Sequence, residues 1–234
     1  QAQHKGQSIE WGGSNLNSVF AQRSNLFKPK FWSMLTDLIR FNQLATQLAE
    51  QEANSQKTAN YSSELMQPLS VFLKENKFGD AFVNWYLLPM LGCIWSCPTE
   101  QMLAFPVATM VRFCHNHGLL QVNNRPQWWT VKGGAKHYVE KIVSSIQNKH
   151  LSTPVQQVKR LDNGQVQVVT TQSEPIFDAV VLATHSDQSL KLLAQASTQE
   201  QSILGAIQYQ DNIAVLHKDE SVMPSKKIAW SAWN

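Results

Sequence analysis

Two closely spaced residue pairs mark the part of the sequence that most constrains the fold. Trp128 and Trp129 stand just before Gly133 and Gly134, within the segment 125–142. Because the two glycines carry no Cβ, the backbone there can approach another group closely. Apolar residues then recur at the spacing of an amphipathic helix, at Val139, Ile142, Val143 and Ile146. The segment therefore predicts a loop packed over a ligand and anchored by a helix.

Residues 14–118 have the pattern of a mainly helical region. The longest predicted helix begins at Pro29 and runs for about five or six turns. It is expected to end before residues 50–63, which are polar and patternless and are predicted to form a loop. Its apolar stripe consists of Met34, Leu38, Phe41, Ala45 and Leu48. Further helices are predicted to begin near Pro68, Asp80 and Pro106, and the last should end at Gly118.

Strands are predicted after Gly118. Residues 154–171 have the pattern of a hairpin whose turn is the Asp-Asn-Gly run at 162–164. Residues 178–182 are predicted to form a buried strand. Two further strands are expected at 213–217 and 228–233, and Ser186 and Thr198 are the expected N-caps of two helices. A helical part followed by a mixed part indicates an α+β fold.

Charge and cysteine content exclude several classes of function. The net charge of +3 without a basic block argues against nucleic-acid binding. No run reaches the ~18 apolar residues of a membrane span, so no transmembrane segment is expected. Cys93 and Cys97 lie four residues apart, and His115 follows later, but this spacing favours buried or inert thiols over zinc, so no metal is expected. Three cysteines are too few and odd for a disulfide framework, which favours a cytoplasmic location.

The run 177–184 is a candidate ligand site. A predicted buried strand ends there in small residues, and a capped helix follows. Ligands of open α/β sheets bind where strands end, and a helix N-terminus favours a phosphate. Taken alone, an ordinary strand-to-helix connection is the better interpretation. Val155, taken alone, is simply the start of a strand.

Aromatic residues and one histidine are candidates for a substrate site. His115 is either an acid–base group or a polar residue at a helix end, and the helix end is favoured. Trp95, Trp128 and Trp129 either line an apolar cavity or belong to the core. The sequence contains neither Gly-x-Ser-x-Gly nor His-Glu-x-x-His, so a hydrolase of those types is not expected.

Taken together, several segments resemble one group of flavin-dependent, amine oxidase-like NAD(P)/FAD-binding proteins. They follow the family's order and cover nearly the whole chain. The matching segments are IEWGG (9–13), VFAQRSNL (19–26), YLLPMLGCIWSCP (86–98), MLAFP (102–106), RFCHNHGLL (112–120), RPQWWTVKGGAKHYV (125–139), FDAVVLATHSDQSLKLL (177–193) and the run from AVLHKD to AWSAWN (214–234).

The resemblance implies a two-domain flavoenzyme with FAD on a Rossmann-like sheet and a helical cap over the flavin. On that pattern, residues 1–13 are a strand entering from the cofactor domain. Residues 14–118 are the substrate or cap domain, and residues 119–234 are part of the FAD-binding domain. The parent enzyme is expected to oxidise a C–N or C–C bond of a small or apolar substrate by hydride transfer to flavin.

The resemblance also implies roles for individual residues. Val155 corresponds to a residue whose backbone contacts the adenine, and Ala183 and Thr184 correspond to the phosphate side of the site. Gly133 and Gly134 correspond to a loop near the cofactor. Independently of the resemblance, the aromatic density beside the double glycine predicts a substrate cavity lined by Trp95, Trp128, Trp129 and His115. No catalytic base is assigned, because the flavin supplies most of the chemistry.

One departure from the family pattern limits these expectations. Relatives begin with G-x-G-x-x-G, which holds the pyrophosphate, whereas this chain contains no Gly-x-Gly. The chain therefore resembles an internal piece of a longer flavoprotein, lacking also the C-terminal part, and is expected to bind FAD weakly or not at all. Two alternatives stay open, a flavin-dependent lipid or isoprenoid desaturase and a non-catalytic module that self-associates through exposed strand edges.

Overall fold

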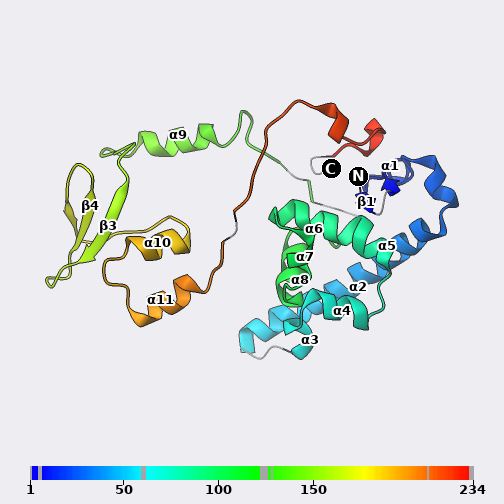
Figure 1. Cartoon of the computed structure of the whole chain (residues 1–234), viewed down its shortest axis with the longest axis horizontal. Coiled ribbons are helices and arrows are strands. Elements are labelled where there is room, and N and C mark those ends of the chain that lie inside the picture. Colours follow the sequence, from blue (N-terminus) through cyan, green and yellow to red (C-terminus); the bar gives the residue numbers. More distant parts are fainter. Residues whose placement is uncertain are drawn as a thin grey trace. The chain divides into compact units, whose positions relative to one another are not determined.

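The computed structural model describes residues 2–4, 7–58, 62–121, 126–127, 129–209 and 211–231 (Figure 1). Helices and antiparallel strands both occur, so the predicted α+β class is confirmed. The chain forms two compact units, each described by itself below. Unit 1 comprises residues 1–128 and 212–234, and unit 2 comprises residues 129–211. The domain boundaries expected at residues 13 and 118 stay predictions.

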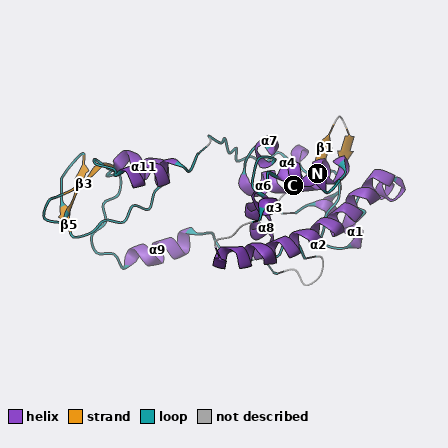
Figure 2. Ribbon diagram, turned by 90° about the horizontal axis from the view of Figure 1, so that it is seen from below, coloured by secondary structure: helices purple, strands orange, loops and turns teal. Residues whose placement is uncertain are grey.

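Unit 1 is mainly helical, with one short hairpin at its start (Figure 2). The hairpin pairs β1 (Ala2–His4) with β2 (Gln7–Ile9) in antiparallel register. The helical elements are α1 (Leu16–Val19), η1 (Arg23–Phe27), α2 (Pro29–Thr58), α3 (Ser63–Met66), α4 (Leu69–Glu75), α5 (Asp80–Phe82), η2 (Val83–Leu87), α6 (Leu88–Trp95), α7 (Thr99–Met102), α8 (Val107–Asn116), η3 (Glu220–Val222) and η4 (Lys227–Ala229).

Helix α2 begins at Pro29 as predicted, but it is longer than its pattern indicated. The predicted apolar stripe faces the core, since Met34, Phe41, Ala45 and Leu48 are buried. The prediction that residues 50–63 form a loop is wrong for residues 50–58, which continue the helix, and for Ser63, which begins α3; residues 59–61 lie outside the described residues. The cause is a tertiary contact. Glu52 lies on the core side of the helix, is buried and pairs with Arg112 of α8.

The helix predicted to begin near Asp80 is expected from its pattern to end near Leu88, but it continues to Trp95 through the π-helical turn η2. Pro89 lies at the start of α6 and has no N–H to donate to the preceding turn. A wider turn accommodates that loss without ending the helix. Leu91 beyond it is buried, so core packing stabilises the continuation.

The core of unit 1 lies between α2 and the helices packed against it. Helix α8 ends as predicted, with Gly118 in the left-handed region at φ +64°. Aromatic rings form a continuous contact from Phe41 through Phe82 to Tyr86. The fully buried large side chains include Phe31, Phe41, Phe72, Phe82, Leu65, Leu69 and Leu91.

The segment 212–231 contains no strand among its described residues, so the strands predicted at 213–217 and 228–231 are wrong; residues 232–233 lie outside the described residues. Leu216 is fully exposed and Ile213 is 88% exposed, which leaves no apolar face for a strand to bury. The segment instead forms η3 and η4, and η4 lies beside α1.

Unit 2 is built on a three-stranded antiparallel sheet in the order β3-β4-β5. Its strands are β3 (Val155–Arg160), β4 (Val166–Thr170) and β5 (Ile176–Phe177), and its helices are α9 (Lys136–Ser144), α10 (Ser186–Leu192) and α11 (Thr198–Gly205). The predicted hairpin is confirmed, with Gly164 at φ +85° in its turn. On the other side of β3, Leu193 forms a parallel bridge to Val158.

Two local predictions in unit 2 are wrong. Residues 178–182 form no strand, and Val181 is 89% exposed, because no described strand pairs with this run. The helix caps are each one residue earlier than expected. His185 is the N-cap of α10, and Ser197 caps α11 through a reciprocal capping box with Glu200.

Candidate functional site

The glycine pair before α9 adopts a backbone that favours glycine at both positions. Gly133 has φ +82° and Gly134 has φ +91°. A Cβ at Gly133 would lie 2.2 Å from Nε2 of His137, whereas a Cβ at Gly134 would meet nothing within 4 Å. The close approach predicted for this loop is therefore made at Gly133, and the group approached is a side chain of the following helix.

Only one of the two tryptophans before this loop lies among the described residues. Trp129 is 88% exposed. Trp128 lies outside the described residues. The proposal that both line a substrate cavity stays a prediction.

The connection 178–186 leads from β5 into α10, and Ala183 and Thr184 in it are exposed. The hydroxyl of Thr184 lies 2.7 Å from the hydroxyl of Ser189, which is buried. This contact fixes the end of the connection against the first turn of α10. Of the two predicted phosphate-side residues, Thr184 is thus held in place by the helix that follows it.

An aromatic residue 23 residues further along the chain packs against the start of α10. Tyr209 stacks on His185 with ring centroids 4.4 Å apart and an interplanar angle of 10°. Its hydroxyl accepts a hydrogen bond of 3.0 Å from the backbone N–H of Ser186. The local sequence did not indicate Tyr209, because the contact spans 23 residues and follows no periodic pattern.

A shallow depression adjoins this contact. Its volume is about 330 Å³, and it is lined by Asp187, Leu190, Lys191, Gly205, Ile207, Gln208 and Tyr209. Asp187 and Lys191 form an ion pair of 3.6 Å at its edge. Within the described part of the chain, Oγ of Ser186 and Oδ1 of Asp187 are buried and have no hydrogen-bond partner. Both atoms therefore lack a partner although they are closed off from solvent.

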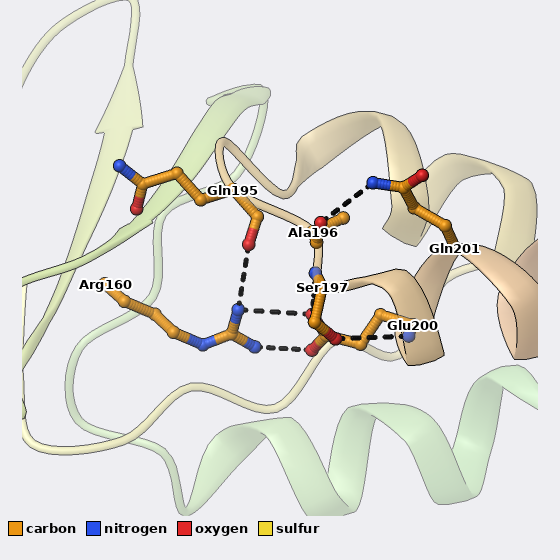
Figure 3. Close-up of polar contacts among 6 residues, drawn as sticks. All are labelled: Arg160, Gln195, Ala196, Ser197, Glu200 and Gln201. Carbon is orange, nitrogen blue, oxygen red and sulfur yellow. Dashed lines mark hydrogen bonds and ion pairs between the residues drawn. The ribbon is translucent and has the colours of Figure 1, made fainter.

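A bidentate ion pair joins the sheet to α11 (Figure 3). The two guanidinium nitrogens of Arg160 lie 2.5 Å and 3.3 Å from the carboxylate oxygens of Glu200. Arg160 also donates to the backbone carbonyl of Gln195. The hydrogen bond from Arg160, followed by that from the Ser197 backbone, lowers the pKa of Glu200 to about 2. The pair orients α11 on β3 and is structural in this arrangement.

The predicted cofactor-side residues occupy three places in unit 2. Val155 is at the start of β3, is 37% exposed and pairs with Thr170. Gly133 lies before α9, and Thr184 lies before α10. Their roles toward a cofactor stay predictions.

The predicted substrate-side residues Trp95 and His115 lie in unit 1. Trp95 contacts Phe113 at 4.6 Å and Phe105 at 6.0 Å between ring centroids. The ring of His117 stacks on the ring of Phe113, with centroids 4.1 Å apart. His115 is exposed on α8. The sequence pattern singled out Trp95 but not Phe113, whose ring is tilted against Trp95 and stacked on His117.

The cysteines are free thiols, and Cys114 is buried in α8. Burial raises the pKa of the Cys114 thiol to about 12.

Among the described residues, no three His, Cys, Asp or Glu side chains gather as metal ligands. Nor does any helix in the described ranges have both the length and the apolar character that a membrane crossing needs.

The described residues fit FAD only in part. A pyrophosphate is held by backbone N–H groups at a helix N-terminus or a glycine-rich loop. Here the N–H of Ser186 donates to Tyr209, and the close approach at Gly133 is made to His137. These residues by themselves do not form a pyrophosphate site.

Comparison with known proteins reveals a likeness of fold. No family model matches the chain, and no curated protein matches it. The chain is similar in structure to the CLA-producing fatty acid isomerase from P. acnes, with a TM-score of 0.50 and 15% sequence identity. The likeness covers 76% of this chain and 40% of the isomerase, so the chain spans less than half of that structure. At this identity the similarity concerns the fold alone.

Proposed function

We propose that the chain is part of an FAD-dependent oxidoreductase of the amine oxidase-like type. The observation that carries the proposal is the fold likeness to an enzyme over 76% of this chain. The order of the family-like segments along the sequence supports it independently. When bound, the flavin would accept a hydride from a C–N or C–C bond of the substrate.

In this proposal the chain's own residues position the cofactor and the substrate. Val155, Ala183 and Thr184 would lie on the adenine and phosphate side, with Gly133 and Gly134 in a loop near the cofactor. Trp95, Trp128, Trp129 and His115 are the proposed substrate-side residues, which would exclude water from the reacting bond.

The substrate is either an amine or a lipid-like molecule. The isomerase that shares the fold acts, as its name says, on a fatty acid, which favours the lipid or isoprenoid alternative. A turnover screen of the longer parent with amines, fatty acids and isoprenoids distinguishes the two, because only the true substrate is depleted.

Flavin retention tests the class of enzyme. A parent chain that carries an upstream G-x-G-x-x-G should retain FAD and show its visible absorption, whereas residues 1–234 alone should retain little or none. In the parent, Ala183→Trp should weaken FAD binding by blocking the phosphate side. Gln172→Trp, in the exposed turn before β5, is the matched control. A colourless parent would refute the proposal, and stoichiometric FAD on residues 1–234 would refute the need for the upstream unit.

A non-catalytic, self-associating module is the second candidate. The edge strand β5 is exposed at Ile176 and Phe177, and the run after it exposes Val181. Unpaired apolar strand edges tend to pair with another chain. Sedimentation velocity should then show a dimer or larger species that Val181→Lys dissociates and Val222→Lys does not. A monomer at all concentrations would exclude this candidate.

A further inference from the structure

The carboxylate of Glu10 binds a segment more than two hundred residues away in sequence. Oε1 of Glu10 accepts a 2.8 Å hydrogen bond from the backbone N–H of Ser225. Oε2 accepts 2.9 Å hydrogen bonds from the Ser225 hydroxyl and the backbone N–H of Lys226. Glu10 is only 7% exposed, so these bonds replace its contact with water. Three donors on one buried carboxylate form a specific site for this segment.

The same segment packs against the residues that follow Glu10. The indole N–H of Trp230 donates to the carbonyl of Pro224 at 2.8 Å, which closes the segment into a compact turn. A Cβ added at Gly12 would lie 3.7 Å from Cα of Ala229. Figure 1 shows this red segment beside the blue α1, in agreement with the contact between α1 and η4. The Glu10 carboxylate therefore anchors residues 224–230 on the start of unit 1.

We propose that Glu10, Ser225 and Lys226 form a latch that holds residues 224–230 on unit 1 and that opens when the Glu10 carboxylate is protonated. A protonated carboxyl has one fewer acceptor and one added donor, so it cannot accept all three hydrogen bonds. The latch goes beyond the proposed function, because it requires neither cofactor nor substrate.

The groups around the latch favour the ionised carboxylate. Burial by itself raises the pKa of Glu10, but hydrogen bonds from Ser225 and Lys226 lower it, and the net shift of the pKa is downward from 4.5. Two lysines lie close to Glu10: Lys226 belongs to the bound segment itself, and Lys28 bonds to Asn25, whose side-chain amide donates to the Glu10 carbonyl. Arg23 of η1 bonds instead to Asn17 and Phe20. Because the folded pKa is lowered, the latch is stabilising above pH 4.5 and opens as the pH falls through the folded value.

Hydrogen exchange of the 234-residue chain tests the latch. At neutral pH, Glu10→Gln should reduce protection of the Ser225 and Lys226 amides about tenfold or more, because the Gln amide group faces a donor where the carboxylate accepts. Ser225→Ala, which keeps both backbone bonds, should reduce it less. Glu200→Gln, which removes a comparable carboxylate in unit 2, is the control and should leave these two amides unchanged.

The unmodified chain gives a second, independent readout. Corrected for the intrinsic exchange rate, its protection of the Ser225 and Lys226 amides should fall between pH 7 and about pH 3, while that of core amides such as Phe41 persists. In Glu10→Gln the low protection should not change further over this range. Unchanged protection in Glu10→Gln at neutral pH, or loss of protection at the same pH in both chains, would overturn the proposal.

Discussion

Glu52 of α2 and Arg112 of α8 form an ion pair of 3.1 Å although they lie 60 residues apart in sequence. The Glu52 side chain is 3% exposed and the Arg112 side chain is 47% exposed, so the carboxylate is buried and the guanidinium reaches it from the surface. The pair joins the last third of α2 to α8. It explains why a polar stretch without periodicity is helical.

Removing the arginine should therefore destabilise unit 1. We expect Arg112→Met to lower the free energy of unfolding by about 1–2 kcal/mol, less than for a fully buried pair because Arg112 is half exposed. Chemical denaturation followed by circular dichroism measures the change. Lys191→Met breaks the exposed Asp187–Lys191 pair and should cost no more than about 0.5 kcal/mol. Equal effects of the two substitutions would contradict a special role for Glu52.

The two glycines before α9 should differ in their tolerance of a side chain. Gly133→Ala and Gly134→Ala both place alanine in the left-handed region, at a cost of about 1 kcal/mol each. Only Gly133→Ala also forces the His137 ring to move. Hydrogen exchange of the α9 amides should show a larger loss of protection for Gly133→Ala.

Replacing the histidine separates the two contributions. In the double variant Gly133→Ala with His137→Ala, the protection of the α9 amides should recover to the level seen in Gly134→Ala. The steric conflict is then gone, while the backbone cost of alanine at position 133 remains. A double variant as impaired as Gly133→Ala alone would show that the ring of His137 is not the group approached.

The Arg160–Glu200 pair should persist at strongly acidic pH. Because the folded pKa of Glu200 is lowered to about 2 from 4.5, the pair stabilises unit 2 above pH 4.5 and its contribution is lost as the pH falls through about 2. Carbon NMR of the Glu200 carboxyl group should give a midpoint near 2. In Arg160→Met that midpoint should rise toward 4.5, and a midpoint already near 4.5 in the unmodified chain would disprove the contact.

The cysteines should react with iodoacetamide in a defined order. Cys93 is exposed, whereas Cys114 is buried and its pKa is raised from 9.0 to about 12, which lowers its thiolate fraction about a thousandfold. Mass spectrometry at neutral pH should find Cys93 labelled and Cys114 labelled only after denaturation. Rapid labelling of Cys114 in the native chain would mean that the α8 face of the core opens readily.

Features that depend on neighbouring residues were predictable from the sequence. The start of α2 at Pro29 and its buried stripe follow from helical periodicity, which operates over three or four residues. The β3–β4 hairpin follows from its turn, where Gly164 supplies the positive φ that a tight connection requires. Predictions of this kind placed the main elements of both units and the α+β class.

Local sequence patterns predicted less of the candidate site than of the fold. The sequence identified the connection at Ala183 and Thr184, but not that Tyr209 occupies the N–H of Ser186. It singled out Trp95, but not Phe113, whose ring contacts Trp95 in a tilted arrangement. Each of these contacts joins residues that lie on different turns or different elements, so no spacing rule encodes them.

The sequence by itself determined the starts of α2 and α8 and the turn of the β3–β4 hairpin, because prolines and glycines act on the backbone next to them. Only the tertiary structure decided how far α2 extends, since that depends on Glu52 meeting Arg112 across the core. The run 178–182 has the composition of a buried strand but is exposed, because a strand needs a paired neighbour to satisfy its backbone. The contact between Glu10 and Ser225 is of the same kind, since a carboxylate is buried only where distant donors converge on it.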